Sequence, residues 1–187
     1  SPNTKLLFTP ESYLIVKGNL IMIGSKDQPI YLGPLEKIQS KRNTSPKTKK
    51  YLPPYFKGLY VLSGEKKSRL ENVIIENTTF LKDGILSLTG GVTFYKTNVE
   101  LKNVNFLGSS AEDALNIVHS NYKLENVLIT NCNSDAFDSD FSSGKISHSR
   151  FKNIKGDALD FSGSEVELEK IYISNVSDKA FSVGENS

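Results

Sequence analysis

The sequence is poor in several residue types on which particular protein classes depend. Its 187 residues contain one cysteine, one methionine, two histidines and no tryptophan. A single cysteine excludes an intramolecular disulfide framework, and with only two histidines beside it a structural zinc site is poorly supplied. We expect Cys132 to be a small packing residue. No apolar run reaches the roughly 18 to 20 residues of a membrane span, because Lys17 and Asn19 interrupt the best candidate, residues 13–23.

The net charge of +2 hides an uneven distribution along the chain. Residues 1–107 contain 16 Lys and Arg against 8 Asp and Glu, whereas residues 108–187 contain 7 against 13. The positive charge is concentrated in a stretch that also contains three prolines. This composition predicts a solvated lateral loop at residues 37–56. Nucleic-acid sites instead interleave basic and aromatic groups on ordered elements, so we expect no nucleic-acid partner.

A repeat of 22 residues organises the second half of the sequence. Four alanines recur at this spacing, in the segments Asp113-Ala-Leu-Asn, Asp135-Ala-Phe-Asp, Asp157-Ala-Leu-Asp and Lys179-Ala-Phe-Ser. Three columns of mainly apolar residues share the period: Leu124, Ile146 and Leu168; Val127, Ser149 and Ile171; Ile129, Phe151 and Ile173. Earlier copies, which begin at Leu101 and Leu70, join the columns after spacings of 23 and 31 residues. A repeat of this length indicates a solenoid.

Within each copy the chain alternates apolar with polar residues over short runs, which is the period of a β-strand. No segment shows a helical stripe. Asparagines recur two residues past the third column, at Asn77, Asn131, Asn153 and Asn175, with Gly108 once in their place. Stacked asparagines can pass amide hydrogen bonds between coils and tolerate the left-handed conformation of a bend. We predict one all-β domain over residues 1–187, a single-stranded right-handed parallel β-helix with about 22 residues per coil.

With these features the chain resembles the right-handed parallel β-helix superfamily typified by pectate lyases and polygalacturonases. The stretch Leu88-Thr-Gly-Gly-Val-Thr-Phe-Tyr and the copies after it are also similar to bacterial secreted β-helix repeat proteins. The resemblance implies a secreted or cell-surface location. The sequence opens without the apolar core of a signal peptide and ends inside a copy of the repeat. We therefore expect a segment of a longer protein, with further domains in the same chain.

Strand alternation predicts which side chains point out of the coil. If Leu115, Leu159 and Phe181 point inward, their successors point outward. The residues that follow them are Asn116, Asp160 and Ser182, and the equivalent residue of the second copy is Asp138. We expect these four residues to form an outward stripe that faces solvent and binds a ligand. Asp140 extends the stripe sideways. Because closely spaced carboxylates suit Ca²⁺, the trio Asp138, Asp140 and Asp160 is a candidate calcium site.

A second column precedes this strand and consists of Asp113, Asp135, Asp157 and Lys179. In the resemblance to polygalacturonases, Asn133-Ser-Asp135 stands where the family has Asn-Thr-Asp, and Gly156-Asp157 where it has Gly-Asp-Asp. The resemblance implies Asp135 and Asp157 as a catalytic carboxylate pair. However, Ala158 replaces the second Asp of Gly-Asp-Asp, and the family's histidine and Arg-x-Lys segment are absent. We therefore expect no hydrolase activity from these residues alone.

Aspartate before a small residue at a bend is also common turn chemistry, in which the carboxylate accepts local backbone N–H groups. Three functions stay open on the sequence. The leading hypothesis is a domain that binds a polysaccharide along its acidic flank, with catalysis undecided. The alternatives are a structural spacer or adhesin stalk without a ligand, and a polygalacturonase-like glycoside hydrolase. His119 and His148 fall outside the carboxylate columns, and we expect both at the surface.

Overall fold

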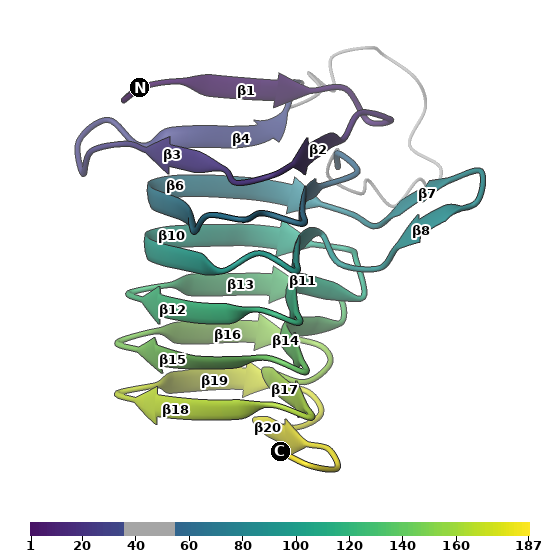
Figure 1. The fold of residues 1–187 in the computed structure, drawn as a ribbon, viewed down its shortest axis with the longest axis vertical. Helices are drawn as coiled ribbons and strands as arrows, with labels where there is room; N and C mark the ends of the chain where they lie inside the picture. The colour runs from purple at the N-terminus through teal and green to yellow at the C-terminus, as the bar shows by residue number, and fades with distance from the viewer. Residues whose placement is uncertain (36–54) are drawn as a thin grey trace, which may run out of the picture.

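The structure is a computed structural model that describes residues 1–35 and 55–187. Twenty strands and no helix occur in these two ranges. The strands are stacked in coils about a vertical axis in Figure 1, with the N-terminus at the top and the C-terminus at the bottom. No helix in the described part of the chain could cross a membrane.

Two all-parallel sheets form the walls of the stack. The 11-stranded sheet contains β1 (Lys5–Phe8), β3 (Ile21–Ile23), β4 (Ile30–Pro34), β6 (Ser68–Thr78), β10 (Val99–Ser109), β12 (Asn121–Glu125), β13 (Leu128–Cys132), β15 (Ser143–Ser147), β16 (Arg150–Ile154), β18 (Glu165–Glu169) and β19 (Tyr172–Val176). The 7-stranded sheet contains β2 (Leu14–Lys17), β5 (Leu59–Leu62), β9 (Val92–Tyr95), β11 (Asp113–Val118), β14 (Asp135–Asp140), β17 (Leu159–Ser162) and β20 (Phe181–Val183). Because the chain passes repeatedly from the 11-stranded wall to the 7-stranded wall and back, it is a parallel β-solenoid.

The predicted repeat is the register of the stack. Leu124 pairs with Ile146 and Ile146 with Leu168 in the 11-stranded sheet. In the 7-stranded sheet, the neighbours of the four repeated alanines pair in the same way from β11 to β20. Apart from their last members at the C-terminal end, Leu168 and Phe181, which are exposed, these in-register columns belong to one continuous apolar core that includes Phe94, Phe137 and Phe151, all fully buried. The predicted columns are therefore confirmed.

The spacing of 31 residues has a local cause. A short antiparallel hairpin of β7 (Leu81–Asp83) and β8 (Leu86–Leu88) is inserted between β6 and β9 and projects sideways from the stack (Figure 1). β6 and β10 nevertheless pair in register on both sides of their bend, Leu70 with Leu101 and Ile75 with Phe106. The insertion thus lengthens one coil without disturbing the core.

Each coil turns at three corners, and from Ser63 onward a residue with positive φ occupies each of them. The first corner is a bend within the 11-stranded sheet, inside β6 and β10 and between two strands in later coils, and contains Asn72, Asn103, Asn126, His148 and Lys170. The second corner contains Asn77, Gly108, Asn131, Asn153 and Asn175. The third corner, after the 7-stranded sheet, contains Ser63, Lys96, His119, Phe141 and Gly163. Asparagine and glycine suit such positions because they adopt the left-handed conformation at low cost. The predicted asparagine column is the second corner.

The predicted basic loop falls almost entirely on residues 36–54, which lie outside the described residues. Its predicted C-terminal bound, residue 56, is wrong. Phe56 is fully buried and stacks on Phe8, with ring centroids 4.5 Å apart and an interplanar angle of 9°. Because its backbone also forms a parallel bridge with Thr78, the chain has already rejoined the solenoid at this residue.

Candidate functional site

The predicted ligand-binding stripe lies on the outer surface of the 7-stranded sheet. Pairing from β11 to β20 places its members in one in-register column, Asn116, Asp138, Asp160 and Ser182. Asp140 lies two residues beyond Asp138 on the same side of β14, because side chains alternate along a strand. We call these five residues the acidic flank. The structure therefore brings together the side chains that strand alternation predicted.

The acidic flank is less open than expected. The Asn116 side chain is only 7% exposed, and Asp138 and Asp160 are half-buried. The segment that follows the β7–β8 hairpin accounts for the cover over Asn116. A Cβ atom on Gly90 would lie 3.1 Å from the Asn116 Cβ, so the backbone at Gly90 lies directly against this side chain. The expectation that the whole stripe faces solvent is wrong at its N-terminal end.

Asn116 connects the two carboxylates of β14. Its side-chain amide donates to Asp138 Oδ2 over 3.0 Å and to Asp140 Oδ2 over 3.3 Å. Burial raises the pKa of Asp138 to about 7, with further contributions from the charges of Asp140 and Asp160. The amide hydrogen bond acts in the opposite direction but does not cancel burial. Near neutral pH the flank therefore contains a carboxyl group that can both donate and accept hydrogen bonds.

Asp113 lies at the start of β11, beside the flank. It is 4% exposed, and burial together with the charge of Asp138 raises its pKa to about 8. No lysine or arginine forms an ion pair with Asp113 in the ranges that the structure describes. Two carboxyl groups with raised pKa values thus lie near each other, Asp138 on the flank and the buried Asp113 beside it. Such groups can serve in proton transfer or in neutral hydrogen bonding.

Asp135 and Asp157, the candidate catalytic pair, bind the backbone of the next coil. Asp135 Oδ1 accepts the N–H of Asp157 over 2.7 Å, and Asp157 Oδ1 accepts the N–H of Lys179 over 2.8 Å. Gly156 makes the first contact possible, since a Cβ there would overlap Asp135 Oδ1. The Lys179 ammonium also lies 3.1 Å from Asp157 Oδ2. Both carboxylates thus have a structural role, but it differs from the local turn chemistry that the sequence offered as an alternative, because each N–H belongs to the next coil, 22 residues away.

No metal site is apparent at the candidate calcium trio. Within residues 1–35 and 55–187, no three His, Cys, Asp or Glu side chains converge in a way that could hold a metal ion. Asp138, Asp140 and Asp160 share one surface without forming such a group. The only cysteine gives no alternative, because Cys132 is 2% exposed and burial raises the pKa of its thiol to about 12. The prediction that Cys132 is a packing residue is confirmed.

An aromatic strip borders the acidic flank and was missed by the sequence analysis. His119 stacks on Phe141 with ring centroids 5.2 Å apart, and Tyr95 meets His119 edge-on at 6.1 Å. Phe141 directly follows Asp140 and is 63% exposed. The rings meet because the third corner places residues of successive coils one above another. His119 was correctly expected at the surface, and its 22-residue spacing from Phe141 was the available signal.

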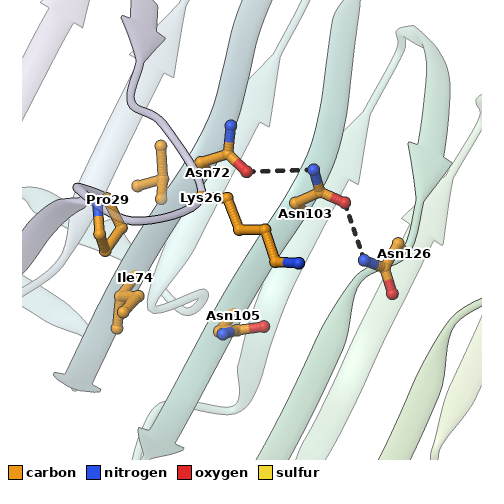
Figure 2. Close-up of a pocket in the computed structure, with 8 residues that line it drawn as sticks. Lys26, Pro29, Asn72, Ile74, Asn103, Asn105 and Asn126 are labelled. Atoms are coloured by element: carbon orange, nitrogen blue, oxygen red, sulfur yellow. Dashed lines mark hydrogen bonds between the residues drawn. The ribbon is translucent and has the colours of Figure 1, made fainter. Parts of the chain in front are cut away.

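A groove at the first corner was also missed. It has a volume of about 430 Å³ and lies against the loop between β3 and β4. Figure 2 shows the Lys26 side chain extending from this loop across the strands, with its ammonium group between Asn103 and Asn105. The groove is lined by Lys26, Pro29, Asn72, Val73, Ile74, Asn103, Asn105 and Asn126. We call it the Asn72 groove.

Comparison with known proteins adds no assignment. The chain matches no protein-family model and no curated protein.

Proposed function

We propose that this β-solenoid is a secreted or cell-surface domain that binds a polysaccharide along its acidic flank. The observation that carries the proposal is the aromatic strip beside the flank. Hydrogen-bonding groups recur on the four strands β11, β14, β17 and β20, and the three rings of the aromatic strip lie at the ends of β9, β11 and β14. Sugars present hydroxyl groups and apolar C–H faces together, so a surface of this composition matches a polymer of sugar units.

The charge of the flank favours a neutral polysaccharide. Asp138, Asp140 and Asp160 lie on one surface, and a uronate polymer would add further negative charge beside them. Carboxylate and amide groups instead make good partners for sugar hydroxyls, because they accept and donate hydrogen bonds. The raised pKa of Asp138 adds a donor at neutral pH. We therefore expect neutral glycans to bind more tightly than uronate-rich ones.

A binding assay on a panel of neutral and uronate-rich polysaccharides tests the proposal. The triple variant Asp138→Asn, Asp140→Asn and Asp160→Asn should lose binding, and Phe141→Ala should weaken it by about tenfold. A matched control removes three exposed charges elsewhere, by Glu165→Gln, Glu167→Gln and Glu185→Gln. Loss of binding in the control would show that net charge matters rather than the flank. If no polysaccharide of the panel binds when the binding sites are present at roughly millimolar concentration, the proposal is wrong.

A spacer or stalk is the second candidate, and the Asp135 and Asp157 contacts favour it. Both carboxylates are used to hold consecutive coils together, which is what a rod requires. For a spacer, the triple variant of the flank would change stability without any glycan ligand being found. A polygalacturonase-like glycoside hydrolase is the third candidate function. In support of it, Asp135 and Asp157 occupy matching positions in adjacent coils, although Asp157 is paired with Lys179.

A further inference from the structure

The Asn72 groove is built by a loop that is held against the first corner. Asn72 donates its side-chain amide to the carbonyl of Gly24 over 3.2 Å, and the Gly24 N–H donates to the carbonyl of Glu71 over 2.8 Å. A Cβ on Gly24 would come within 2.5 Å of the Asn72 carbonyl oxygen, so a larger residue would push the loop away. Ser25 and Gln28 close the loop through reciprocal backbone hydrogen bonds of 3.1 and 3.2 Å. The groove is therefore formed before any ligand arrives.

One edge of the groove is a short ladder of side-chain amides. Asn126 donates to Asn103 Oδ1 over 2.7 Å, and Asn103 donates to Asn72 Oδ1 over 3.1 Å, as Figure 2 shows. The ladder stops at Asn126 because His148 occupies the next position of the corner. In the described part of the chain, Asn126 Oδ1 accepts no hydrogen bond. Each ladder amide also keeps a second N–H that its neighbour does not use.

Two further polar groups converge on the groove without a protein partner. The Asn105 side-chain amide, half-buried on β10, makes no hydrogen bond to any described residue. The Lys26 ammonium forms no ion pair within residues 1–35 and 55–187, and the lining contains no carboxylate that could neutralise it. The groove thus offers one positive charge beside unused amide donors and acceptors.

The remaining lining is apolar. Val73 is fully buried, and Pro29 and Ile74 are half-buried against the groove. Ligand pockets typically have volumes of about 300 to 1,000 Å³ and combine an apolar lining with a few placed polar groups. At about 430 Å³ the Asn72 groove belongs to this class. It is large enough for a ligand of one or two rings.

We infer that the Asn72 groove is a second ligand site, which binds a small anionic ligand rich in hydroxyl groups, such as a sugar phosphate or a sugar acid. The anionic group would be held by Lys26, and the hydroxyl groups by the amides of Asn105 and Asn126. The apolar floor would contact the C–H face of the sugar ring. Because the groove is at the corner opposite the 7-stranded sheet, this site does not depend on the polysaccharide proposal.

Titration calorimetry of the full chain with glucose 6-phosphate, glucuronate and glucose tests the inference. These probes share a sugar ring and differ in the anionic group, so they separate a phosphate ligand from a carboxylate ligand and from a neutral one. We expect at least one of the two anions to bind more tightly than glucose. We also expect that affinity to fall with added salt, because a partly exposed ion pair is screened.

Three variants locate the binding. Lys26→Met removes the charge from an exposed loop residue and should lower the affinity for the anion by about tenfold. Asn105→Leu removes the free amide at similar side-chain volume. It should lower the affinities for the anion and for glucose to a similar degree. Lys66→Met removes an equally exposed lysine from the loop between β5 and β6, outside the groove, and should change nothing. Near-identical circular dichroism spectra of the variants would show that folding is unchanged.

Three results would overturn the inference. The first is no heat of binding for either anion up to roughly 10 mM. The second is an affinity that is equal in Lys26→Met and in the unaltered chain. The third is a Lys66→Met variant that loses as much affinity as Lys26→Met, which would indicate diffuse attraction to positive charge. The flank variants should leave this binding unchanged, so failure here and failure of the polysaccharide proposal are separate outcomes.

Discussion

Asn153 donates its side-chain amide to Asn131 Oδ1 over 3.0 Å, and the two residues have φ angles of 58° and 61°. One residue type thus meets two requirements at the second corner, the left-handed backbone and the bond to the next coil. Asn175 continues the ladder by donating to Asn153 over 3.0 Å. The two requirements can be separated by substitution, because glycine satisfies only the first and alanine satisfies neither.

We expect Asn153→Gly to lower the free energy of unfolding by about 1 kcal/mol, through the lost ladder hydrogen bonds. Asn153→Ala should lower it by about 2 to 3 kcal/mol, because alanine, unlike glycine, keeps a Cβ at positive φ at a cost of about 1 to 2 kcal/mol, and it lacks the polar side chain that makes this conformation tolerable for asparagine. Urea unfolding of both variants measures the difference. Equal losses in the two variants would mean that backbone conformation contributes little at this corner.

The buried carboxyl groups beside the flank predict how stability depends on pH. The pKa of Asp113 is raised to about 8 and that of Asp138 to about 7, from an ordinary value of 3.8. The folded state therefore holds these protons more tightly than the unfolded state. The stability that they contribute is present at low pH and declines as pH rises through roughly 4 to 8, by up to about 1.4 kcal/mol per pH unit for each group.

Asp113→Asn tests this dependence, since the amide has the same shape and does not titrate. We expect the variant to be more stable than the unaltered chain near pH 9 and similar to it near roughly pH 4. Asp27→Asn, at an exposed loop position, is the control and should follow the unaltered chain. Urea unfolding at a series of pH values gives the comparison. A variant that is as stable as the unaltered chain near roughly pH 4 but less stable near pH 9 would contradict the prediction, because it would show that the fold favours the charged form of Asp113.

Asp157 should be more important for stability than its exposed neighbour. Asp157→Ala leaves the Lys179 N–H without its partner and removes a carboxylate that is 6% exposed, so we expect a loss of about 2 kcal/mol. Asp178→Ala removes only the exposed side of the same ion-pair group and should cost less than about 0.5 kcal/mol. Thermal or urea unfolding compares the two.

A substitution at Asp135, the other member of the candidate pair, bears on catalysis. We expect residues 1–187 to release no reducing sugar from polygalacturonate, because the polygalacturonase pattern is incomplete and both candidate carboxylates bind backbone groups. If the unaltered chain does release reducing sugar and Asp135→Asn does not, the expectation is contradicted and the hydrolase is favoured. The stability of Asp135→Asn has to be measured beside it, to separate lost chemistry from lost folding.

Calcium gives a further test of the flank. Since the described residues contain no convergent group of three ligands, we expect millimolar Ca²⁺ to shift the melting temperature by less than about 1 °C relative to a chelator. A clear rise with Ca²⁺ that Asp138→Ala abolishes would instead favour the calcium site at Asp138, Asp140 and Asp160.

Most of the fold could be predicted because the solenoid repeats its physical requirements at each coil. Ala114 and Ala136 occupy equivalent positions in successive coils and have equivalent surroundings, so the same residue types recur at a fixed spacing. The second corner was visible for the same reason. The first corner was not recognised because its left-handed positions are filled by asparagine, histidine and lysine, which form no single-residue column. Different side chains can meet one backbone requirement when they point to solvent.

The candidate sites were only partly predictable because they depend on segments that break the repeat. Strand alternation placed Asn116 and Asp138 on one surface, but nothing in the spacing showed that the backbone at Gly90 would cover Asn116. The Asn72 groove depends on the loop that contains Lys26, and this loop meets Asn105 across a separation of 79 residues in the sequence. Contacts of that kind are set by the whole stack rather than by local pattern.

The direction of the hydrogen bonds in the two sheets has a mechanical consequence. They run from coil to coil along the axis of the stack, as the pairing of β12 with β15 and β15 with β18 requires. A tension applied between the two ends of the chain would therefore break the hydrogen bonds of one coil before those of the next, so the coils would separate one after another. A load applied across the stack would be shared by many strands at once. Such a body would resist crosswise force far better than lengthwise force.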